Sequence, residues 1–189
     1  SWPEGQSVND YISEDLATVS YSSVDVALGL VLDIGAGAEM AKSDIKSAFR
    51  LLPVHPADFE LLGIHFNDQW YVDKALPMGC SILCSLFEAF STFLEWVFSQ
   101  VTGSDRVTHY LDDFFFVGTP GSADCQKQLA SFKELMEYLG VPLAIEKTVG
   151  PDTRMTFLGI EIDSKAMARM PADKKKVMLA LIAAMLDKE

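Results

Sequence analysis

Three aspartates are the residues of this chain best suited to bind a metal ion. Asp112 and Asp113 are adjacent within the run HYLDDFFFVG, and Asp44 follows the run MAKS. Carboxylate oxygens are the ligands that Mg²⁺ prefers, and the ion usually binds one or two of them together with substrate phosphates. Two such ions side by side stabilise the attacking and leaving oxygens in phosphoryl transfer. The three aspartates therefore predict a divalent-metal site suited to that chemistry.

The apolar surroundings of Asp112 and Asp113 make this pair unusual. Removing an unpaired carboxylate from water is costly, so two of them are a poor choice for a core. A solvated turn with two acids would be the simpler explanation, and chance alone gives a Tyr-x-Asp-Asp string in roughly 3–4% of chains of this composition. The flanking run FFFV argues against the solvated turn, because it would keep the pair close to a buried surface.

Hydrophobic periodicity and turn residues predict the elements that must position these aspartates. Helical periodicity, or a proline at a helix start, predicts helices over residues 23–34, 81–102, 123–138 and 171–186. Strand patterns occur over residues 38–45, on both sides of residues 67–69, at RVTHY and FFFVG around the acidic pair, at TFLGIEID and at AMARM. This order predicts an α+β fold in which an antiparallel sheet is backed by two helices.

The length and composition are those of one globular domain. The chain has 189 residues, of which 49% are hydrophobic and 22% charged, which is enough to bury a core. No uncharged apolar run reaches the about 18 residues of a membrane span, and no basic signal-peptide region opens the chain. We therefore expect an intracellular protein, in the cytoplasm or the nucleus, without a membrane partner. Cys80, Cys84 and Cys125 are expected to be reduced core thiols rather than zinc ligands.

The formal net charge of −12 is unevenly distributed along the chain. Residues 1–41 contain seven acids and no lysine or arginine, whereas Lys174, Lys175 and Lys176 are clustered near the end. Affinity for a nucleic-acid backbone comes from Lys and Arg that neutralise phosphates. By itself, this chain is therefore not expected to bind nucleic acid tightly, and the imbalance suggests that it is part of a longer one.

Five sequence motifs, in order along the chain, resemble those of reverse transcriptases. YLDD at residues 110–113 resembles their YxDD box, KSDIKSAFRLLPVHP resembles their first palm motif, and ALPMG resembles their LPxG box. GVPLAIEKT is similar to the motif after the second palm helix, and TFLGIEID is similar to the primer-grip hairpin. The amino-acid sequences of these motifs are most similar to those of reverse transcriptases from DIRS-like, tyrosine-recombinase retrotransposons. The joint match covers nearly the whole chain, from about residue 7 to residue 171.

The resemblance implies a right-hand polymerase palm with partial fingers over residues 1–170, and the start of a thumb or connection over residues 171–189. It implies DNA synthesis on an RNA or DNA template with a primer and deoxynucleoside triphosphates. Two Mg²⁺ ions, for which Mn²⁺ can substitute, would be bound by Asp44, Asp112, Asp113 and the backbone carbonyl of Ile45. Segments of fingers, thumb and RNase H would belong to a longer polyprotein.

Further residues take roles by their motif positions. Lys147 falls where the family places a lysine near the pyrophosphate, which makes it a candidate general acid, although a solvated surface lysine is an equally good explanation. Phe49 falls at the position of an aromatic gate that would exclude a 2′-hydroxyl, with a core aromatic as the alternative. Met78 and Gly79 would lie at the nucleotide, and the primer would contact Tyr110, Leu158 and Gly159.

Two departures from the family pattern leave other functions open. The LPxG box often has Gln where this chain has Met78, so any amide contact to the nucleotide is absent and Met78 would fill space instead. The chain begins after the basic fingers segment, which favours a non-catalytic remnant that serves as an acidic interaction domain. The intact aspartates and Phe49 oppose that interpretation. An RNA-dependent RNA polymerase palm would instead have a smaller polar residue at position 49 and Gly in place of Leu111.

Overall fold

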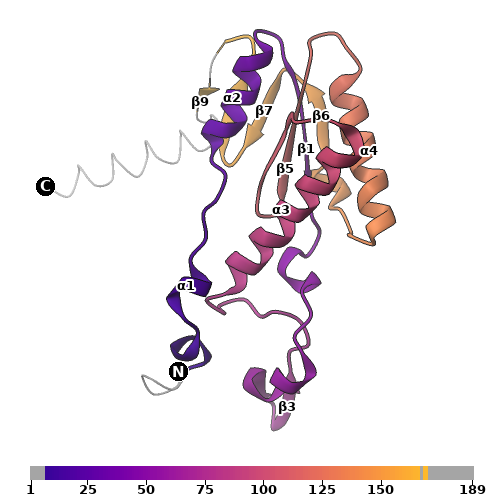
Figure 1. Cartoon of the computed structure of the whole chain (residues 1–189). Coiled ribbons are helices and arrows are strands. Elements are labelled where there is room, and N and C mark those ends of the chain that lie inside the picture. The colour runs from indigo at the N-terminus through magenta and orange to yellow at the C-terminus, as the bar shows by residue number, and fades with distance from the viewer. Residues whose placement is uncertain (1–6, 167, 170–189) are drawn as a thin grey trace, which may run out of the picture.

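A computed structural model describes residues 7–166, 168 and 169 of the chain (Figure 1). The α-helices are α1 Glu14–Ala17, α2 Val24–Ile34, α3 Leu83–Thr102 and α4 Asp124–Leu139, and the 3₁₀ helices are η1 Val8–Tyr11, η2 Ala48–Leu51, η3 Pro56–Leu62 and η4 Ile145–Lys147. The strands are β1 Glu39–Asp44, β2 Gly63–Phe66, β3 Gln69–Val72, β4 Val107–Tyr110, β5 Asp113–Gly118, β6 Val149–Asp152, β7 Arg154–Phe157, β8 Ile160–Asp163 and β9 Ala168–Arg169.

The centre of the molecule is a four-stranded antiparallel sheet in the order β4-β5-β1-β6. β5 lies between β1 and β4, and its aromatic run Phe114–Phe116 is fully buried. Successive residues of a strand point to opposite faces of the sheet. Phe114 and Phe116 pack with α3 and α4, whereas Phe115 and Val117 pack with α2, β7 and β8. Apolar layers therefore cover both faces, which explains an uninterrupted apolar run where simple alternation would be expected.

The helices begin and end close to where the sequence predicts. Ser23 caps α2 by accepting a hydrogen bond from the backbone N–H of Asp25. Gly103 and Gly140 follow α3 and α4 with φ of 69° and 71°, a left-handed conformation that glycine adopts without steric cost. The expected antiparallel sheet backed by two helices is confirmed. α2 and the smaller sheet β7-β8-β9 form an additional layer on the opposite face (Figure 1).

The predicted hairpin around residues 67–69 is also confirmed. β2 and β3 pair with Phe66 opposite Gln69, and Asn67 and Asp68 make the two-residue turn at φ of 51° and 57°. Such a turn needs positive φ at both central residues, which Asn and Asp tolerate. Both strands are exposed along their length, and Figure 1 shows the hairpin at the end of the molecule remote from α2.

Several sequence expectations differ from the structure. TFLGIEID is a hairpin of β7 and β8, as its resemblance to the primer-grip hairpin implies, rather than the single strand of the local pattern. β9 at AMARM pairs with β8, as expected of its mate. β6, at the sheet edge, contains Gly150 and Pro151 and was not predicted from the sequence. A proline is tolerated there because an edge strand leaves some N–H groups unpaired. The predicted helix 171–186, and with it the thumb segment 171–189, lies outside the described residues.

The cysteines fulfil the expectation only in part. All three are free thiols, but Cys125 is buried whereas Cys80 and Cys84 are half-buried. Burial raises the pKa of the Cys125 thiol to about 12, so it remains protonated near neutral pH. Among the described residues, no helix is both long and apolar enough to cross a membrane.

Candidate active site

Asp44 and Asp113 are directly opposite one another across β1 and β5. In the antiparallel register Asp44 pairs with Asp113, and on the other side Tyr110 of β4 also pairs with Asp113. Residues that are directly opposite in antiparallel strands have their side chains on the same face. Asp44 and Asp113 thus lie together at one end of the sheet, as the sequence predicts for the end of one strand and the start of another.

Asp112 belongs to the tight turn that joins β4 to β5. The turn consists of Leu111 and Asp112, with Leu111 at φ of 50°. The carbonyl of Asp112 accepts a hydrogen bond of 2.9 Å from the N–H of Ile45, the residue after β1. This bond joins the turn that carries Asp112 to the end of β1, which carries Asp44. Backbone hydrogen bonds therefore fix the three aspartates relative to one another.

Lys147 reaches the aspartates from the segment that follows α4. Its Nζ lies 3.1 Å and 3.0 Å from the two carboxylate oxygens of Asp44. Two backbone hydrogen bonds bring this segment to β1, from Ala144 N–H to the Asp44 carbonyl and from Lys46 N–H to the Pro142 carbonyl. The Lys147 side chain is 60% exposed and that of Asp44 only 8%. The lysine therefore neutralises a buried carboxylate while its own surface stays accessible.

Burial and neighbouring charges shift the pKa values of the side chains at this end of the sheet. Burial, together with the negative charge of Asp44, raises the pKa of Asp113, and burial is also the main cause that raises the pKa of Asp112. The hydrogen bonds to Asp44 raise the pKa of Lys147, so its ammonium is stabilised. A site that gathers buried carboxylates without equal positive charge favours an added cation.

The donor set fits a hard divalent cation, although the side chains are not arranged as a closed metal cage. Within the ranges that the structure describes, no group of three or more His, Cys, Asp or Glu side chains is positioned to bind a metal ion. In this arrangement the Lys147 ammonium is the positive partner of Asp44. The oxygen-only chemistry of Asp44, Asp112 and Asp113 at one sheet end nevertheless suits Mg²⁺, which keeps several waters and few protein ligands.

The residues expected at the nucleotide lie beyond the end of β1 and before α3. The ring of Phe49 is half-buried and packs edge-to-face on Phe87, with 5.1 Å between ring centroids. Met78 is 80% exposed, so it does not pack in the core, and its expected place under the nucleotide stays a prediction. Gly79 has φ of 94°, and its carbonyl accepts a 2.8 Å hydrogen bond from the Asn9 side chain.

The residues expected at the primer lie on two different elements. Tyr110, at the end of β4, is half-buried and its ring lies against Tyr21, with 5.0 Å between centroids. Leu158 and Gly159 form the turn of the β7–β8 hairpin at φ of 47° and 79°. Leu158 packs against the apolar layer that also contacts Tyr110.

Three residues near the aspartates were not singled out from the sequence. Lys42 is two residues before Asp44 and hence on the same face of β1, and its charge acts to lower the pKa of Asp113. Because alternate residues of a strand share a face, Lys42 could have been identified by counting two residues back from Asp44. Glu88 and His109 lie behind the turn: Glu88 accepts a hydrogen bond of 3.2 Å from the Leu111 N–H. No sequence signal links a glutamate in a helix to that N–H.

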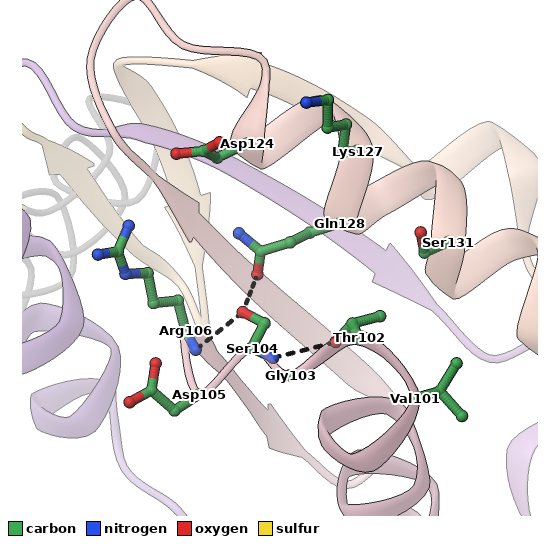
Figure 2. A pocket seen from close by; sticks show the side chains of 10 residues that line it. All are labelled: Val101, Thr102, Gly103, Ser104, Asp105, Arg106, Asp124, Lys127, Gln128 and Ser131. Atoms are coloured by element: carbon green, nitrogen blue, oxygen red, sulfur yellow. Dashed lines mark hydrogen bonds between the residues drawn. The ribbon is translucent and has the colours of Figure 1, made fainter.

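A separate pocket of about 500 Å³ lies at the opposite end of β4 (Figure 2). Arg106, just before β4, lines it together with Ser104 and Gln128. Figure 2 shows that Ser104 donates a hydrogen bond to the Gln128 side chain, 3.0 Å long, and accepts one from the Arg106 backbone. These contacts join the segment after α3 to α4, so the polar groups of the pocket are used in packing. The pocket is distinct from the aspartates, because they lie at the other end of β4.

Comparison with known proteins assigns the chain to a family. Residues 10–162 match the family "Reverse transcriptase (RNA-dependent DNA polymerase)". Protein P of duck hepatitis B virus (strain China) is 26% identical over 147 residues, which cover 74% of this chain and 17% of that protein. The genome polyprotein of Petunia vein clearing virus (isolate Shepherd) is 28% identical over 121 residues, or 64% of this chain and 5% of the polyprotein. The chain therefore spans less than a fifth of these relatives.

Solved structures with a similar fold include foamy viral enzymes. The protease-reverse transcriptase dRH in complex with double-stranded DNA has a TM-score of 0.68 at 18% identity, over 85% of this chain and 26% of that one. The protease-reverse transcriptase in complex with an RNA/DNA hybrid has a TM-score of 0.64 at 19% identity, over 79% of this chain and 20% of that one. This likeness confirms the palm-like fold that the motifs predict. On the family match over residues 10–162, the chain belongs to the reverse transcriptase family.

Proposed function

We propose that this chain is the catalytic palm of an RNA-directed DNA polymerase, which transfers deoxynucleotides to the 3′-hydroxyl of a primer on an RNA or DNA template. The observation that carries the proposal is the meeting of Asp44, Asp112 and Asp113 at one end of the sheet, with Lys147 against Asp44. Family membership makes polymerase chemistry the natural use of these carboxylates. The foamy viral relatives of the fold were solved with nucleic acid bound, which supports a primer–template partner.

Divalent cations are the cofactor of this proposal, since reverse transcriptases generally use them. Asp44, Asp112 and Asp113 would bind two Mg²⁺ or Mn²⁺ ions, with the carbonyl of Ile45 as a further ligand. When bound, the ions would supply charge stabilisation at the attacking and leaving oxygens. Asp44 and Asp113 contribute by projecting from opposed strands, so their separation is fixed by the sheet rather than by a loop.

Lys147 acts at the phosphates in this proposal. Its Nζ carries a proton whose retention is favoured by Asp44, and its side chain is exposed, so it is available to an incoming triphosphate. It would stabilise the pyrophosphate and donate a proton to the leaving oxygen as general acid. Transfer of Lys147 from Asp44 to the phosphates would free that carboxylate for a metal ion.

The nucleotide and primer are assigned to neighbouring elements. Phe49 would contact the sugar and exclude a 2′-hydroxyl, with its ring supported from behind by Phe87. Exposed Met78 and the backbone of Gly79 would contact the nucleotide. Tyr110 at the end of β4, and the Leu158–Gly159 turn, would contact the primer strand.

The finer origin of the chain is also part of the proposal. The amino-acid sequences of the motifs favour a DIRS-like retrotransposon polymerase. It would act inside the cell as one segment of a longer polyprotein. The two curated relatives named above are much longer viral proteins, which supports a polyprotein setting. In such a polyprotein, other segments would supply basic side chains to offset the net charge of −12 of this chain.

Primer extension on poly(rA)/oligo(dT) tests the proposal, with Mg²⁺ or Mn²⁺ and with deoxy- or ribonucleotides. The chain would be compared in its present form and with upstream fingers added, next to Asp112→Asn and a matched Asp105→Asn, since Asp105 is an exposed acid at the other end of β4. We expect extension that depends on the fingers and on Asp112 but not on Asp105. No incorporation by the extended protein would refute the polymerase assignment, and equal use of ribonucleotides would refute the role of Phe49.

A further inference from the structure

A group of three ionisable side chains, two of them buried, lies behind the catalytic turn. His109 of β4 has Nδ1 2.5 Å from Oε2 of Glu95 and Nε2 3.3 Å from Oε1 of Glu88. Both glutamates belong to α3, seven residues and thus two turns apart, which places them on one side of the helix. We refer to these three residues as the Glu88–His109–Glu95 cluster.

The cluster lies on the face of the sheet opposite to the aspartates. His109 pairs with Phe114, and their rings stack with 5.4 Å between centroids. Phe114 contacts the α3–α4 layer, whereas Asp113, one residue earlier, points to the other face. His109 is 5% exposed and Glu88 8%, whereas the Glu95 side chain is 30% exposed, so His109 and Glu88 form the buried part of the cluster.

Glu88 connects this cluster to the backbone of the catalytic turn. Its Oε2 accepts the hydrogen bond from Leu111 N–H, 3.2 Å long, while its Oε1 faces His109. Leu111 has φ of 50°, a left-handed conformation that residues with a side chain rarely adopt without support. A carboxylate acceptor strengthens such a hydrogen bond relative to a neutral one.

The contacts on His109 define how Glu88 is oriented. The carboxylate of Glu95 holds the imidazole at Nδ1, which leaves Nε2 3.3 Å from Oε1 of Glu88. Within the described part of the chain, two buried side-chain polar atoms have no hydrogen-bond partner, His109 Nε2 and Ser91 Oγ, and Ser91 lies on α3 between the two glutamates. Oε1 of Glu88 therefore lies beside the ring without a hydrogen bond to it, while Oε2 accepts the hydrogen bond from Leu111.

We propose that Glu88, oriented by His109 and Glu95, is a positioning residue that fixes the Leu111–Asp112 turn from behind and so sets the positions of Asp112 and Asp113. The inference rests on the proposed function in so far as it gives this turn a metal-binding role. The structural link itself, from α3 through Glu88 to Leu111, stands independently of that function.

The test uses the isotope-labelled chain of 189 residues and three variants. Glu88→Met removes the acceptor at similar length, Glu88→Gln keeps an oxygen acceptor, and Glu134→Gln changes an exposed glutamate on α4 as a control. The readouts are hydrogen exchange and the proton chemical shift of the Leu111 amide, and the affinity for Mn²⁺ followed by paramagnetic relaxation.

We expect Leu111 exchange to accelerate about tenfold or more in Glu88→Met, with Phe114–Phe116 still protected, because only the local hydrogen bond is lost. Mn²⁺ affinity should fall about threefold or more in the same variant, since the turn is no longer fixed. Glu88→Gln should recover most of both properties, and Glu134→Gln should leave both unchanged.

Three outcomes would overturn the proposal. They are unchanged Leu111 exchange in a folded Glu88→Met protein, faster exchange with unchanged Mn²⁺ affinity, and no recovery in Glu88→Gln. If Glu88→Met does not fold, the Leu111 amide proton shift decides, because it must move when Gln, a weaker acceptor, replaces Glu. If the wild-type chain binds no Mn²⁺ at all, the proposed function fails, while Leu111 exchange still decides whether Glu88 fixes the turn.

Discussion

Asp113 is ionisable in surroundings that disfavour its charge. It is half-buried, it faces Asp44 across the strands, and burial and that neighbour both raise its pKa. Asp44 has the Lys147 ammonium at 3.0 Å, whereas for Asp113 the cations Lys42 and Lys147 act more weakly than burial and Asp44. Such an arrangement lowers the stability of the folded protein, and a catalytic site is where this loss is tolerated.

The first prediction is that Asp113→Asn stabilises the chain near neutral pH. A raised pKa means that the folded state binds the Asp113 proton more tightly than the unfolded state. Ionisation of Asp113 therefore lowers the free energy of unfolding above the folded-state pKa, and this loss disappears as the pH falls toward the unfolded value of about 3.9. Urea unfolding should show the Asp113→Asn protein to be more stable than the wild type near pH 7, with the difference shrinking as the solution is acidified.

The matched control is Asp105→Asn, because Asp105 is exposed and should give the same small effect at both pH values. A destabilised Asp113→Asn protein near pH 7 would contradict the burial of charge inferred here.

The second prediction separates two properties of Lys147. Its ammonium pairs with Asp44, so it competes with any metal ion for that carboxylate. Lys147→Gln should raise Mn²⁺ affinity about threefold to tenfold, because one positive charge is removed beside the aspartates. The same variant should slow nucleotide incorporation by about 10²-fold or more, the usual effect of losing a general acid.

Lys133→Gln on the exposed side of α4 is the control and should change neither property. Lower Mn²⁺ affinity in Lys147→Gln would show that the lysine supports the metal site instead of competing for it.

At the scale of the elements, β5, the strand that begins with Asp113, packs very closely against α4. A Cβ on Gly118, the last residue of β5, would lie 2.6 Å from the Cβ of Cys125 in α4 and closer still to its backbone nitrogen. Only a residue without a side chain allows this packing. Gly29 in α2 is the opposite case, since a Cβ there would meet nothing within 4 Å.

The third prediction uses these two glycines as a pair. Gly118→Ala should destabilise the chain by about 2 kcal/mol, because α4 must move away from the sheet. Gly29→Ala should stabilise it by about 0.5–1 kcal/mol, since alanine loses less backbone entropy than glycine in a helix. Thermal unfolding of both proteins measures the two effects, and a neutral Gly118→Ala would show that β5 and α4 are less tightly packed than the distances indicate.

Elements with one dominant pattern could be predicted from sequence, and elements defined by distant contacts could not. The apolar period of α3 and the Asn67–Asp68 turn are local signals, and both gave the right structure. β6 contains Gly150 and Pro151 and exists because Met40 and Lys42 of β1 pair with it, a contact that no local pattern reports. Phe93 fits the apolar period of α3 and is nevertheless 51% exposed, because periodicity does not report which part of a helix is covered by other elements.

The same distinction applies to the candidate site. Asp44, Asp112 and Asp113 were predicted because adjacent acids in an apolar run are conspicuous and strand ends meet. The structure confirms that Asp44 and Asp113 are opposed, while their roles as metal ligands stay predictions. The ion pair of Lys147 with Asp44 spans 103 positions, and the Glu88 contact with Leu111 spans 23. Such contacts depend on how α3 and the segment after α4 pack, which sequence periodicity does not specify.

At the scale of the whole molecule, the net charge of −12 opposes binding of polyanions. The electrostatic part of nucleic-acid affinity requires cations at the phosphates. Near the aspartates the described cations include Lys147 and Lys42, and both already act on carboxylates. A divalent cation has the opposite relation to this charge, because every carboxylate of the molecule favours its approach.

The last prediction follows from the balance between this attraction and the protons on the site. Asp112 and Asp113, whose pKa values are raised, must both be deprotonated to bind a metal, so affinity should increase with pH through the carboxylate range and level off above it. Without nucleotide, few protein ligands and many retained waters limit Mg²⁺ to a dissociation constant of about 1 mM or weaker. Calorimetric titration near pH 7 and near pH 5 measures both effects, with Asp112→Asn as the variant that should weaken binding and Asp105→Asn as the control. Micromolar affinity would contradict this account, because it would require a preformed set of ligands that the Lys147–Asp44 ion pair does not allow.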